Sequence, residues 1–219
     1  MIERWCLFAL FFAPLYGEQL RYGINLPSGL SLGEVQIRSE PSGDRVSAEF
    51  TVEAAFAGFS ILDRFRSVAT RELCSLEFEK DSVHGKRKAK EKTTFDGVRG
   101  IAVRETAGGG GKTEMQIPAC PRDALAFLSF VRQELSKGRV PPAQSLYFGA
   151  TYQVRLQYSG TQNVRVGDES LETDKIVRSV RGAASDITFE IYFARDAVRT
   201  PVMVKLPLAL GLLSMEIVR

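Results

Sequence analysis

Few residues in this sequence could carry out covalent or acid–base chemistry. The 219-residue chain contains one histidine, His84, and three cysteines. Nucleophilic catalysis by serine or cysteine needs a histidine base that a third group orients, and the sequence shows no such partner for His84. Two cysteines, Cys74 and Cys120, with no histidine near them do not make a zinc site. We therefore predict no catalytic residue, no metal ligand and no cofactor.

Carboxylates leave one remote enzymatic alternative open. Asp63, Asp96, Asp186 and Asp196 lie far apart in the sequence, which does not say whether any two of them meet. Two carboxylates that converged in a cleft could serve as acid and base in a hydrolysis. Aspartates at such positions more often form turns. A carboxylate-based hydrolase is therefore a remote alternative to a protein without enzymatic activity.

A glycine-rich stretch at residues 108–113 (GGGGKT) is similar to the end of a phosphate-binding loop. The full motif needs another glycine where this chain has Thr106, and a helix after the Lys-Thr pair whose amides face the phosphate. Residues 115–118 (MQIP) follow instead, and they are typical of an extended segment that ends at a proline. We interpret the stretch as a hairpin tip and predict no nucleotide binding.

A lysine stripe could bind an anionic partner. Lys86, Lys88, Lys90 and Lys92 alternate, so on one strand they would share a face. Such a stripe could contact lipid head groups or another polyanion, or it could be a solvated face or a protected edge strand. The whole chain has 29 Lys and Arg against 26 Asp and Glu, a net charge of +3. That balance lacks the basic footprint of a nucleic-acid-binding protein.

The first 17 residues indicate export. Arg4 belongs to a short polar start, an apolar run extends from Trp5 to Leu15, and Gly17 supplies a small residue for cleavage. The run is shorter than the roughly 20 residues that span a bilayer, and no later stretch is long and apolar enough to do so. We expect a signal peptide over residues 1–17, cleavage near Gly17, one domain over 18–219, and a periplasmic or otherwise exported location. The alternative is a buried N-terminal element of a cytosolic protein.

Export would place the remaining cysteines in an oxidising space. Cys74 and Cys120 are the pair that the mature chain would keep, and disulfides persist in such compartments. The pair is therefore a disulfide candidate, with two separate buried thiols as the alternative.

The elements that position these residues are mostly strands. Apolar residues alternate with polar ones in many segments, which is typical of antiparallel strands with one buried face. Turn signals rich in glycine, proline and aspartate separate the segments, and we count about ten strands. Clear examples of the alternation are residues 20–26, 46–54, 74–78, 152–158 and 187–193.

One segment has helical spacing. Between residues 122 and 137 apolar residues recur at intervals of three and four, after Pro121 and before Gly138. A sheet with one apolar face needs a cover. We therefore predict a mainly β protein, an antiparallel sheet curled as an open or half barrel around one helix, with a β-sandwich carrying one helix as the alternative.

Aromatic residues gather on the expected inner faces. A curved sheet lined with such residues could hold an acyl chain or another apolar ligand, or its own helix could fill the space. The candidate lining residues are Tyr22, Phe50, Phe78, Tyr152, Tyr158, Phe189 and Phe193.

Several elements of the second half occur in a familiar order. They are residues 94–97 (TFDG), Ile117-Pro118 leading into 123–132 (DALAFLSFVR), Phe148-Gly149 with Tyr152, and 192–202 (YFARDAVRTPV). Together they resemble the bacterial exported domain-of-unknown-function family 3108 (DUF3108), over nearly the whole chain from about Leu20 to Arg219. The resemblance implies a β-rich envelope protein and no activity that can be carried over.

The expected architecture is also similar to that of periplasmic lipoprotein carriers, whose open barrels shelter acyl chains, although a shared fold is weak warrant for function. We therefore expect an exported protein that binds an apolar ligand such as a lipid, or an envelope scaffold. The alternative is a structural module that contacts an envelope protein through a sheet edge or the lysine stripe.

Overall fold

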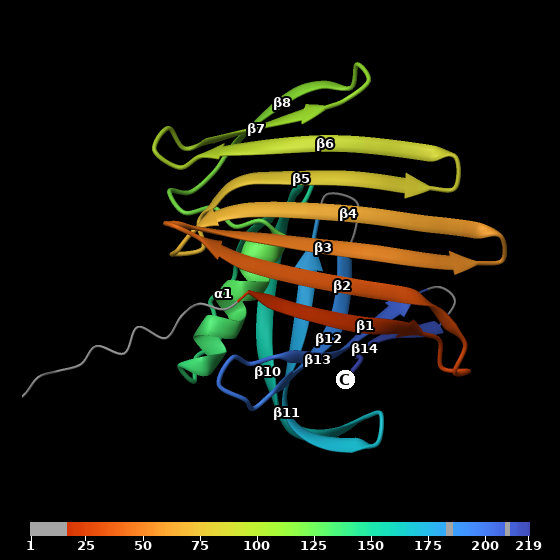
Figure 1. The fold of residues 1–219 in the computed structure, drawn as a ribbon. Coiled ribbons are helices and arrows are strands. Elements are labelled where there is room, and N and C mark those ends of the chain that lie inside the picture. The colour runs from red at the N-terminus through yellow and green to blue at the C-terminus, as the bar shows by residue number, and fades with distance from the viewer. Residues whose placement is uncertain (1–16, 183–185, 209–210) are drawn as a thin grey trace, which may run out of the picture.

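The computed structural model describes residues 17–182, 186–208 and 211–219, where fourteen strands form one sheet that bends around a helix (Figure 1). Apart from Gly17, the expected signal peptide lies outside these residues. The strands before the helix are β1 (Glu18–Asn25), β2 (Ser31–Ser42), β3 (Arg45–Phe56), β4 (Phe59–Thr70), β5 (Ser75–His84), β6 (Arg87–Asp96), β7 (Ile101–Thr106) and β8 (Gly111–Gln116). The helix and the strands after it are α1 (Ala124–Ser136), β9 (Gln144–Tyr147), β10 (Thr151–Val166), β11 (Glu169–Arg181), β12 (Asp186–Ala194), β13 (Pro201–Leu208) and β14 (Gly211–Ile217).

Strands that neighbour each other in the sheet are neighbours in the sequence, with one exception. The order runs from β8 down to β1 and then from β14 down to β9. The exception is the antiparallel pairing of β1 with β14, which places Tyr22 opposite Ile217. This pairing joins two meanders into one continuous sheet that is not closed into a barrel, as the predicted curled sheet requires. The two-sheet sandwich is not formed.

The structure has fourteen strands where the sequence indicated about ten. The difference lies mainly in segments without apolar alternation. Strand β8 has the sequence GKTEMQ with exposed or half-exposed side chains, and β9 has four residues. The glycine-rich stretch is the turn between β7 and β8, as predicted, and a strand follows it.

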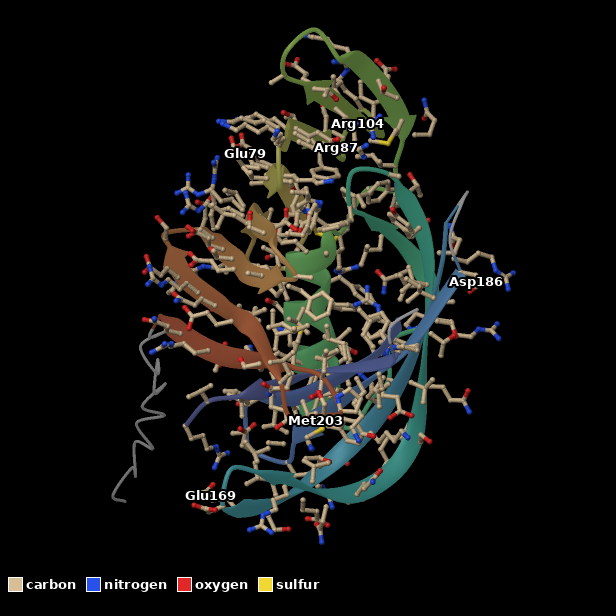
Figure 2. All side chains as sticks on the ribbon, turned by 90° about the vertical axis from the view of Figure 1, so that its right-hand side faces the viewer. Glu79, Arg87, Arg104, Glu169, Asp186 and Met203 are labelled. Carbon is tan, nitrogen blue, oxygen red and sulfur yellow. A yellow bond between two sulfur atoms is a disulfide. The ribbon has the colours of Figure 1, made fainter. Side chains whose placement is uncertain are left out.

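The alternation decides which face of the sheet each residue occupies. Tyr22 and Ile24 of β1 are buried on the concave side, whereas Arg21, which precedes Tyr22, is exposed. Figure 2 looks between the two walls of the curved sheet, with β1–β6 on one side, β10–β12 on the other and α1 between them. The side chains of Glu79 and Asp186 point outward from opposite walls (Figure 2).

Helix α1 (Ala124–Ser136) lies within the predicted segment 122–137 and is shorter at both ends. Asp123 caps its first turn, and Gly138 follows it with φ +73°, a left-handed conformation that glycine adopts without strain. Its apolar side includes Phe127, Val131 and Leu135, which share a core cluster with residues of β9–β12. No helix in the described part of the chain has the length and apolar composition needed to cross a bilayer.

The sheet stays open because another segment occupies the free edge of β9. The backbone of Asp123 makes a parallel bridge with Tyr147, and the Tyr147 amide donates a 3.0 Å hydrogen bond to the Arg122 carbonyl. The residues that lead into α1 therefore take the place that β8 would need for closure. Strand β8 keeps one unpaired edge among the described residues.

Candidate functional site

A cavity separates α1 from the concave face of the sheet. Its volume is about 510 Å³, and aromatic and aliphatic side chains from both walls and from the helix line it. We call it the helix-side cavity. Its lining residues include Tyr22, Ile37, Phe50, Leu128, Phe148, Tyr152, Arg178, Phe189, Val204 and Met215.

A second cavity of about 380 Å³ continues along the same face toward the tips of the β1–β2 and β3–β4 hairpins. We call it the hairpin-side cavity. Met215 lines both cavities, so they are neighbours across one side chain. Phe56 and Phe59, at the end of β3 and the start of β4, line its outer end and are 45% and 50% exposed. The two cavities thus form a largely apolar groove that extends from the helix to the hairpin tips.

Arg178 is the one charged residue among those that line either cavity in the described part of the chain. Its guanidinium carbon lies 5.1 Å from the centre of the Phe127 ring on α1 and 5.2 Å from that of Phe189. The Nε atom is shielded from solvent and has no hydrogen-bond partner among the described residues. Burial lowers the pKa of Arg178 to about 10, so the side chain stays protonated at neutral pH.

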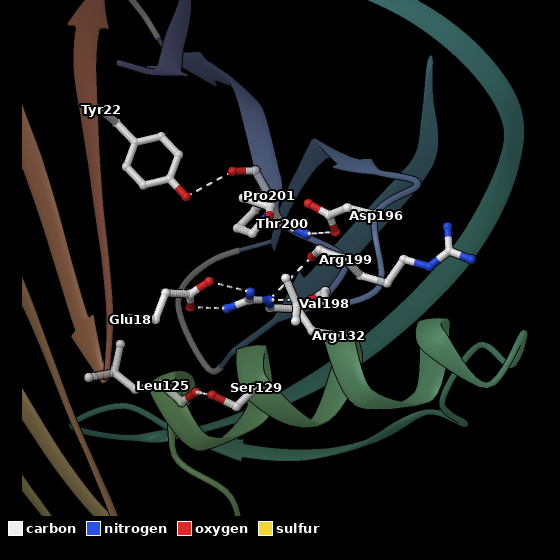
Figure 3. Close-up of polar contacts among 10 residues, drawn as sticks. All are labelled: Glu18, Tyr22, Leu125, Ser129, Arg132, Asp196, Val198, Arg199, Thr200 and Pro201. Atoms are coloured by element: carbon white, nitrogen blue, oxygen red, sulfur yellow. Dashed lines mark hydrogen bonds and ion pairs between the residues drawn. The ribbon is translucent and has the colours of Figure 1, made fainter. Parts of the chain in front are cut away.

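Arg132, a residue of α1 itself, has a different environment. Arg132 donates two hydrogen bonds, of 2.6 and 2.7 Å, to the carboxylate of Glu18. Its Nε lies 3.0 Å from the Val198 carbonyl and 3.2 Å from the Arg199 carbonyl (Figure 3). This arrangement ties the helix to the start of β1 and to the β12–β13 turn. We call it the Arg132 lock.

The same turn also anchors β1. Asp196 accepts a 3.0 Å hydrogen bond from the Thr200 amide and so shapes the turn. The Tyr22 hydroxyl donates a 2.8 Å hydrogen bond to the Pro201 carbonyl (Figure 3), and burial raises the pKa of this hydroxyl. The part of the sequence around residues 192–202 thus meets β1 and the helix at one place. Its role there is structural.

The N-terminal end of α1 is held by a buried carboxylate. Asp123 accepts hydrogen bonds from the Leu125 and Ala126 amides at 2.8 and 3.1 Å. It also accepts from the hydroxyls of Ser67 and Ser75 at 2.7 and 2.6 Å. Burial raises the pKa of Asp123 even though these donors favour its ionised form.

The predicted disulfide lies beside this cap. Cys74 and Cys120 are bonded, with their Cα atoms 4.7 Å apart. The Ser75 amide, next to Cys74, donates a 2.8 Å hydrogen bond to the Pro121 carbonyl. The bond therefore joins the β4–β5 turn to the segment that enters α1.

The seven predicted lining residues occupy three kinds of position. Tyr22, Phe50, Tyr152 and Phe189 line the helix-side cavity. Phe78 and Phe193 are 2% and 0% exposed and pack within the core clusters instead. Tyr158 is 48% exposed and lines neither cavity, and the register of β10 shifts directly after it.

The lysine stripe lies on exposed surface, but its members differ. Lys92 lies 2.8 Å from a carboxylate oxygen of Glu77 and 3.3 Å from one of Glu79. Its ammonium is therefore neutralised locally, and the hydrogen bond to Glu77 raises the pKa of Lys92 most. Lys88 and Lys90 are exposed on the same strand, and Lys86 lies in the turn before it. The four lysines do not form one uniform positive surface.

The remaining candidates for chemistry are in separate local contacts. His84 has a partner that the sequence did not reveal, since its Nε2 lies 2.9 Å from Asp63. Asp96 accepts from the Arg99 amide at 2.9 Å, and Asp186 forms an ion pair with Arg181 at 3.3 Å. No cluster of three or more metal-ligating side chains is found among the described residues.

Sequence reasoning missed Arg178, although the sequence contains a signal for it. Ile176, Arg178 and Val180 occupy alternate positions of β11, and the two apolar members face the helix-side core. A charged residue at an inward position of an alternating strand is the kind of exception that indicates a functional site.

Comparison with solved structures supports the architecture. The chain is similar to the crystal structure of a beta-barrel-like protein of domain of unknown function DUF1849 from Brucella abortus, with a TM-score of 0.62 and 8% sequence identity. The match covers 92% of this chain and 95% of the other. At this identity the likeness concerns the fold alone. None of the curated proteins matches the chain.

The fold and cavities define a mainly β protein with an open, curled antiparallel sheet around one helix and a largely apolar interior groove. The model of the family described as "Protein of unknown function (DUF3108)" matches residues 19–218. The chain belongs to the DUF3108 family. The resemblance inferred from residues 94–202 is thereby confirmed.

Proposed function

We propose that this protein is an exported binding protein that holds an apolar ligand between α1 and the concave face of its sheet. The observation that carries the proposal is the helix-side cavity of about 510 Å³, a space that the side chains of the helix and the sheet do not fill. Ligand sites have volumes of about 300–1,000 Å³ and are lined mainly by apolar and aromatic side chains with few polar groups. Both descriptions fit this cavity.

The packing density of the interior also favours an apolar ligand. Protein interiors are close-packed, and voids larger than a water molecule are few. An apolar groove of two adjoining cavities therefore represents lost packing within the chain alone. A hydrocarbon ligand would restore those contacts and stabilise the folded protein by mass action.

Uptake of a neutral fluorescent probe tests the proposal. The purified protein should bind N-phenylnaphthylamine with enhanced fluorescence, and native mass spectrometry after gentle purification should detect a co-purified apolar molecule. A Leu128→Trp substitution, which adds bulk to a lining residue of α1, should reduce probe uptake. Gln133→Trp, on the exposed side of the same helix, should not. Absence of uptake by the unmodified protein would rule out an apolar-ligand function.

The exported location is part of the proposal. The Cys74–Cys120 disulfide supports it, because stable disulfides form mainly in oxidising compartments. Cell fractionation should recover the protein outside the cytoplasm, and sequencing of its mature N-terminus should begin near Glu18. Retention of Met1 on a cytoplasmic protein would contradict this part.

A second candidate is an interaction module of the cell envelope. It is favoured by the unpaired edge of β8 and by exposed Lys88 and Lys90. Replacing Lys86, Lys88, Lys90 and Lys92 with serine should then weaken capture of a partner from envelope extract. Unchanged capture would remove the lysine stripe from consideration.

A further inference from the structure

The helix-side cavity contains a partly buried charge with no carboxylate partner among the described residues. A guanidinium that leaves water loses hydration, and proteins normally compensate this loss with a carboxylate or with several hydrogen-bond acceptors. Arg178 has none of these for its Nε among the described residues. Burial alone accounts for its lowered pKa, with no neighbouring charge contributing.

The two rings beside Arg178 compensate only part of the loss. Phe127 and Phe189 offer their faces to the guanidinium at 5.1 and 5.2 Å. A cation is attracted to the face of an aromatic ring, but the rings accept none of the five N–H bonds that a guanidinium can donate. The rings therefore leave the guanidinium donors available to a ligand.

Arg178 also lies near a rim of the cavity. Arg178 pairs across the sheet with Phe189. The next pair on the same face, closer to the end of β11 and the start of β12, is Val180 with Ile187. Ile187 lines the cavity and is 39% exposed. A polar head group at Arg178 would therefore remain close to solvent while the rest of a ligand extended inward.

An apolar path extends from Arg178 across the sheet. It starts at Ile176, two residues from Arg178 on the same strand, and follows successive cross-strand partners. These are Ile176 on β11, Ile191 on β12, Val204 on β13, Met215 on β14 and Ile24 on β1. The path spans four strand spacings, about 19 Å at roughly 4.8 Å each. It passes from the helix-side cavity through Met215 to Ile24, which lines the hairpin-side cavity.

We propose that the ligand is an anionic amphiphile, whose carboxylate or phosphate head pairs with Arg178 and whose single alkyl chain extends over Met215 into the hairpin-side cavity. This inference rests on the proposed apolar-ligand function and specifies its ligand class. The planar fork of arginine suits both head groups, because two parallel N–H bonds can reach two oxygens of either. A neutral hydrocarbon would leave the buried charge uncompensated.

Displacement of bound N-phenylnaphthylamine at neutral pH tests the head group. Three competitors with the same alkyl chain differ only at one end: dodecanoate, dodecyl phosphate and dodecanol. We expect at least one of the two anions to displace the probe at about a tenfold lower concentration than dodecanol, which corresponds to one charge-assisted hydrogen-bonded contact. The order of dodecanoate and dodecyl phosphate distinguishes a carboxylate from a phosphate ligand.

Variants of Arg178 connect the preference to this side chain. Arg178→Met should still bind the neutral probe but should lose the preference for anions. The anions and dodecanol should then displace the probe at about the same concentration. Arg178→Lys should retain part of the preference, because the charge remains while the fork is lost. The matched control is Arg181→Met on the same strand, whose side chain is exposed and pairs with Asp186. It should behave like the unmodified protein.

The outcomes separate this inference from the proposed function. If the unmodified protein takes up neither probe nor amphiphile, the apolar-ligand function itself fails. If the probe binds but anions and dodecanol compete equally, or if Arg178→Met keeps the anion preference, the anionic ligand is overturned and the apolar site stands.

Discussion

Arg132 belongs to α1 and Arg178 of β11 lies beside that helix, but the surroundings of the two side chains are opposite in kind. Arg132 is 14% exposed, holds both oxygens of Glu18 and also reaches two backbone carbonyls. Arg178 lies near two aromatic rings, and its shielded Nε has no partner among the described residues. One arginine thus has its donors satisfied within the fold, whereas the other has donors to spare beside a cavity.

The difference separates groups that hold the fold from groups that are available to a ligand. The helix is fixed by satisfied polar contacts at two places, at Asp123 with the neighbouring disulfide and at the Arg132 lock. Between these anchors the helix contributes apolar side chains to a cavity that it does not fill. Substitutions in the two regions should therefore change stability with opposite signs.

Removing the disulfide should have the largest effect. The bond closes a loop with a sequence separation of 46 residues, and the chain-entropy model gives about 4 kcal/mol for such a loop. The Cys74→Ser, Cys120→Ser double variant should lose about this much free energy of unfolding in urea denaturation. A loss below 1 kcal/mol would show that the helix entry is held without the covalent link.

Breaking the Arg132 lock should lower the free energy of unfolding slightly less than removing the disulfide does. Arg132→Met leaves a partly buried Glu18 carboxylate and two carbonyls without their donor, and removing one partner of such a pair costs about 3 kcal/mol. Urea denaturation measures the change. Arg139→Met provides the control, because its ion pair with Glu134 leaves Arg139 largely exposed, and exposed pairs contribute about 0–1 kcal/mol. Equal effects of the two variants would contradict the lock.

Arg178→Met should change stability in the other direction. The substitution removes a partly buried charge whose Nε has no partner among the described residues, and it keeps an apolar side chain. The ligand-free protein should therefore gain about 1 kcal/mol. Urea denaturation of protein from which ligand has been extracted measures this change in the free energy of unfolding. A loss of more than about 1 kcal/mol would indicate that Arg178 supports the fold as Arg132 does, and the contrast between the two would disappear.

The smallest effect is expected on the outer surface. Lys88→Ser and Lys90→Ser should change the free energy of unfolding by less than about 0.5 kcal/mol, because both side chains are exposed. Thermal unfolding of each variant is sufficient to check this. A larger loss would show that these lysines stabilise β6.

Much of the architecture could be predicted because it depends on local patterns. Alternation identified which residues of β1 and β3 face the helix, and three- and four-residue spacing identified α1. Strand β8 could be inferred only from the hairpin tip before it, because its polar sequence carries no such pattern. The disulfide could be proposed because one cysteine pair remained.

The candidate site depended on contacts that local patterns do not record. Glu18 and Arg132 are separated by 114 positions, and their pairing requires the β1–β14 junction to bring β1 to the helix. Whether the space beside α1 is filled depends on the sizes of many side chains at once, so alternation could not decide it. Arg178 was visible as an exception on β11, but its meaning depended on the cavity.

The β1–β14 pairing has a consequence for the order of synthesis. A chain grows from its N-terminus, so β1 to β8 are made before β14 exists, and each of their own pairings is with a sequence neighbour. Until β14 arrives, the outer edge of β1 offers unpaired amides and carbonyls to any other extended chain. Nascent or truncated molecules that stop before Gly211 should therefore be the species that associate through their edges and need a chaperone.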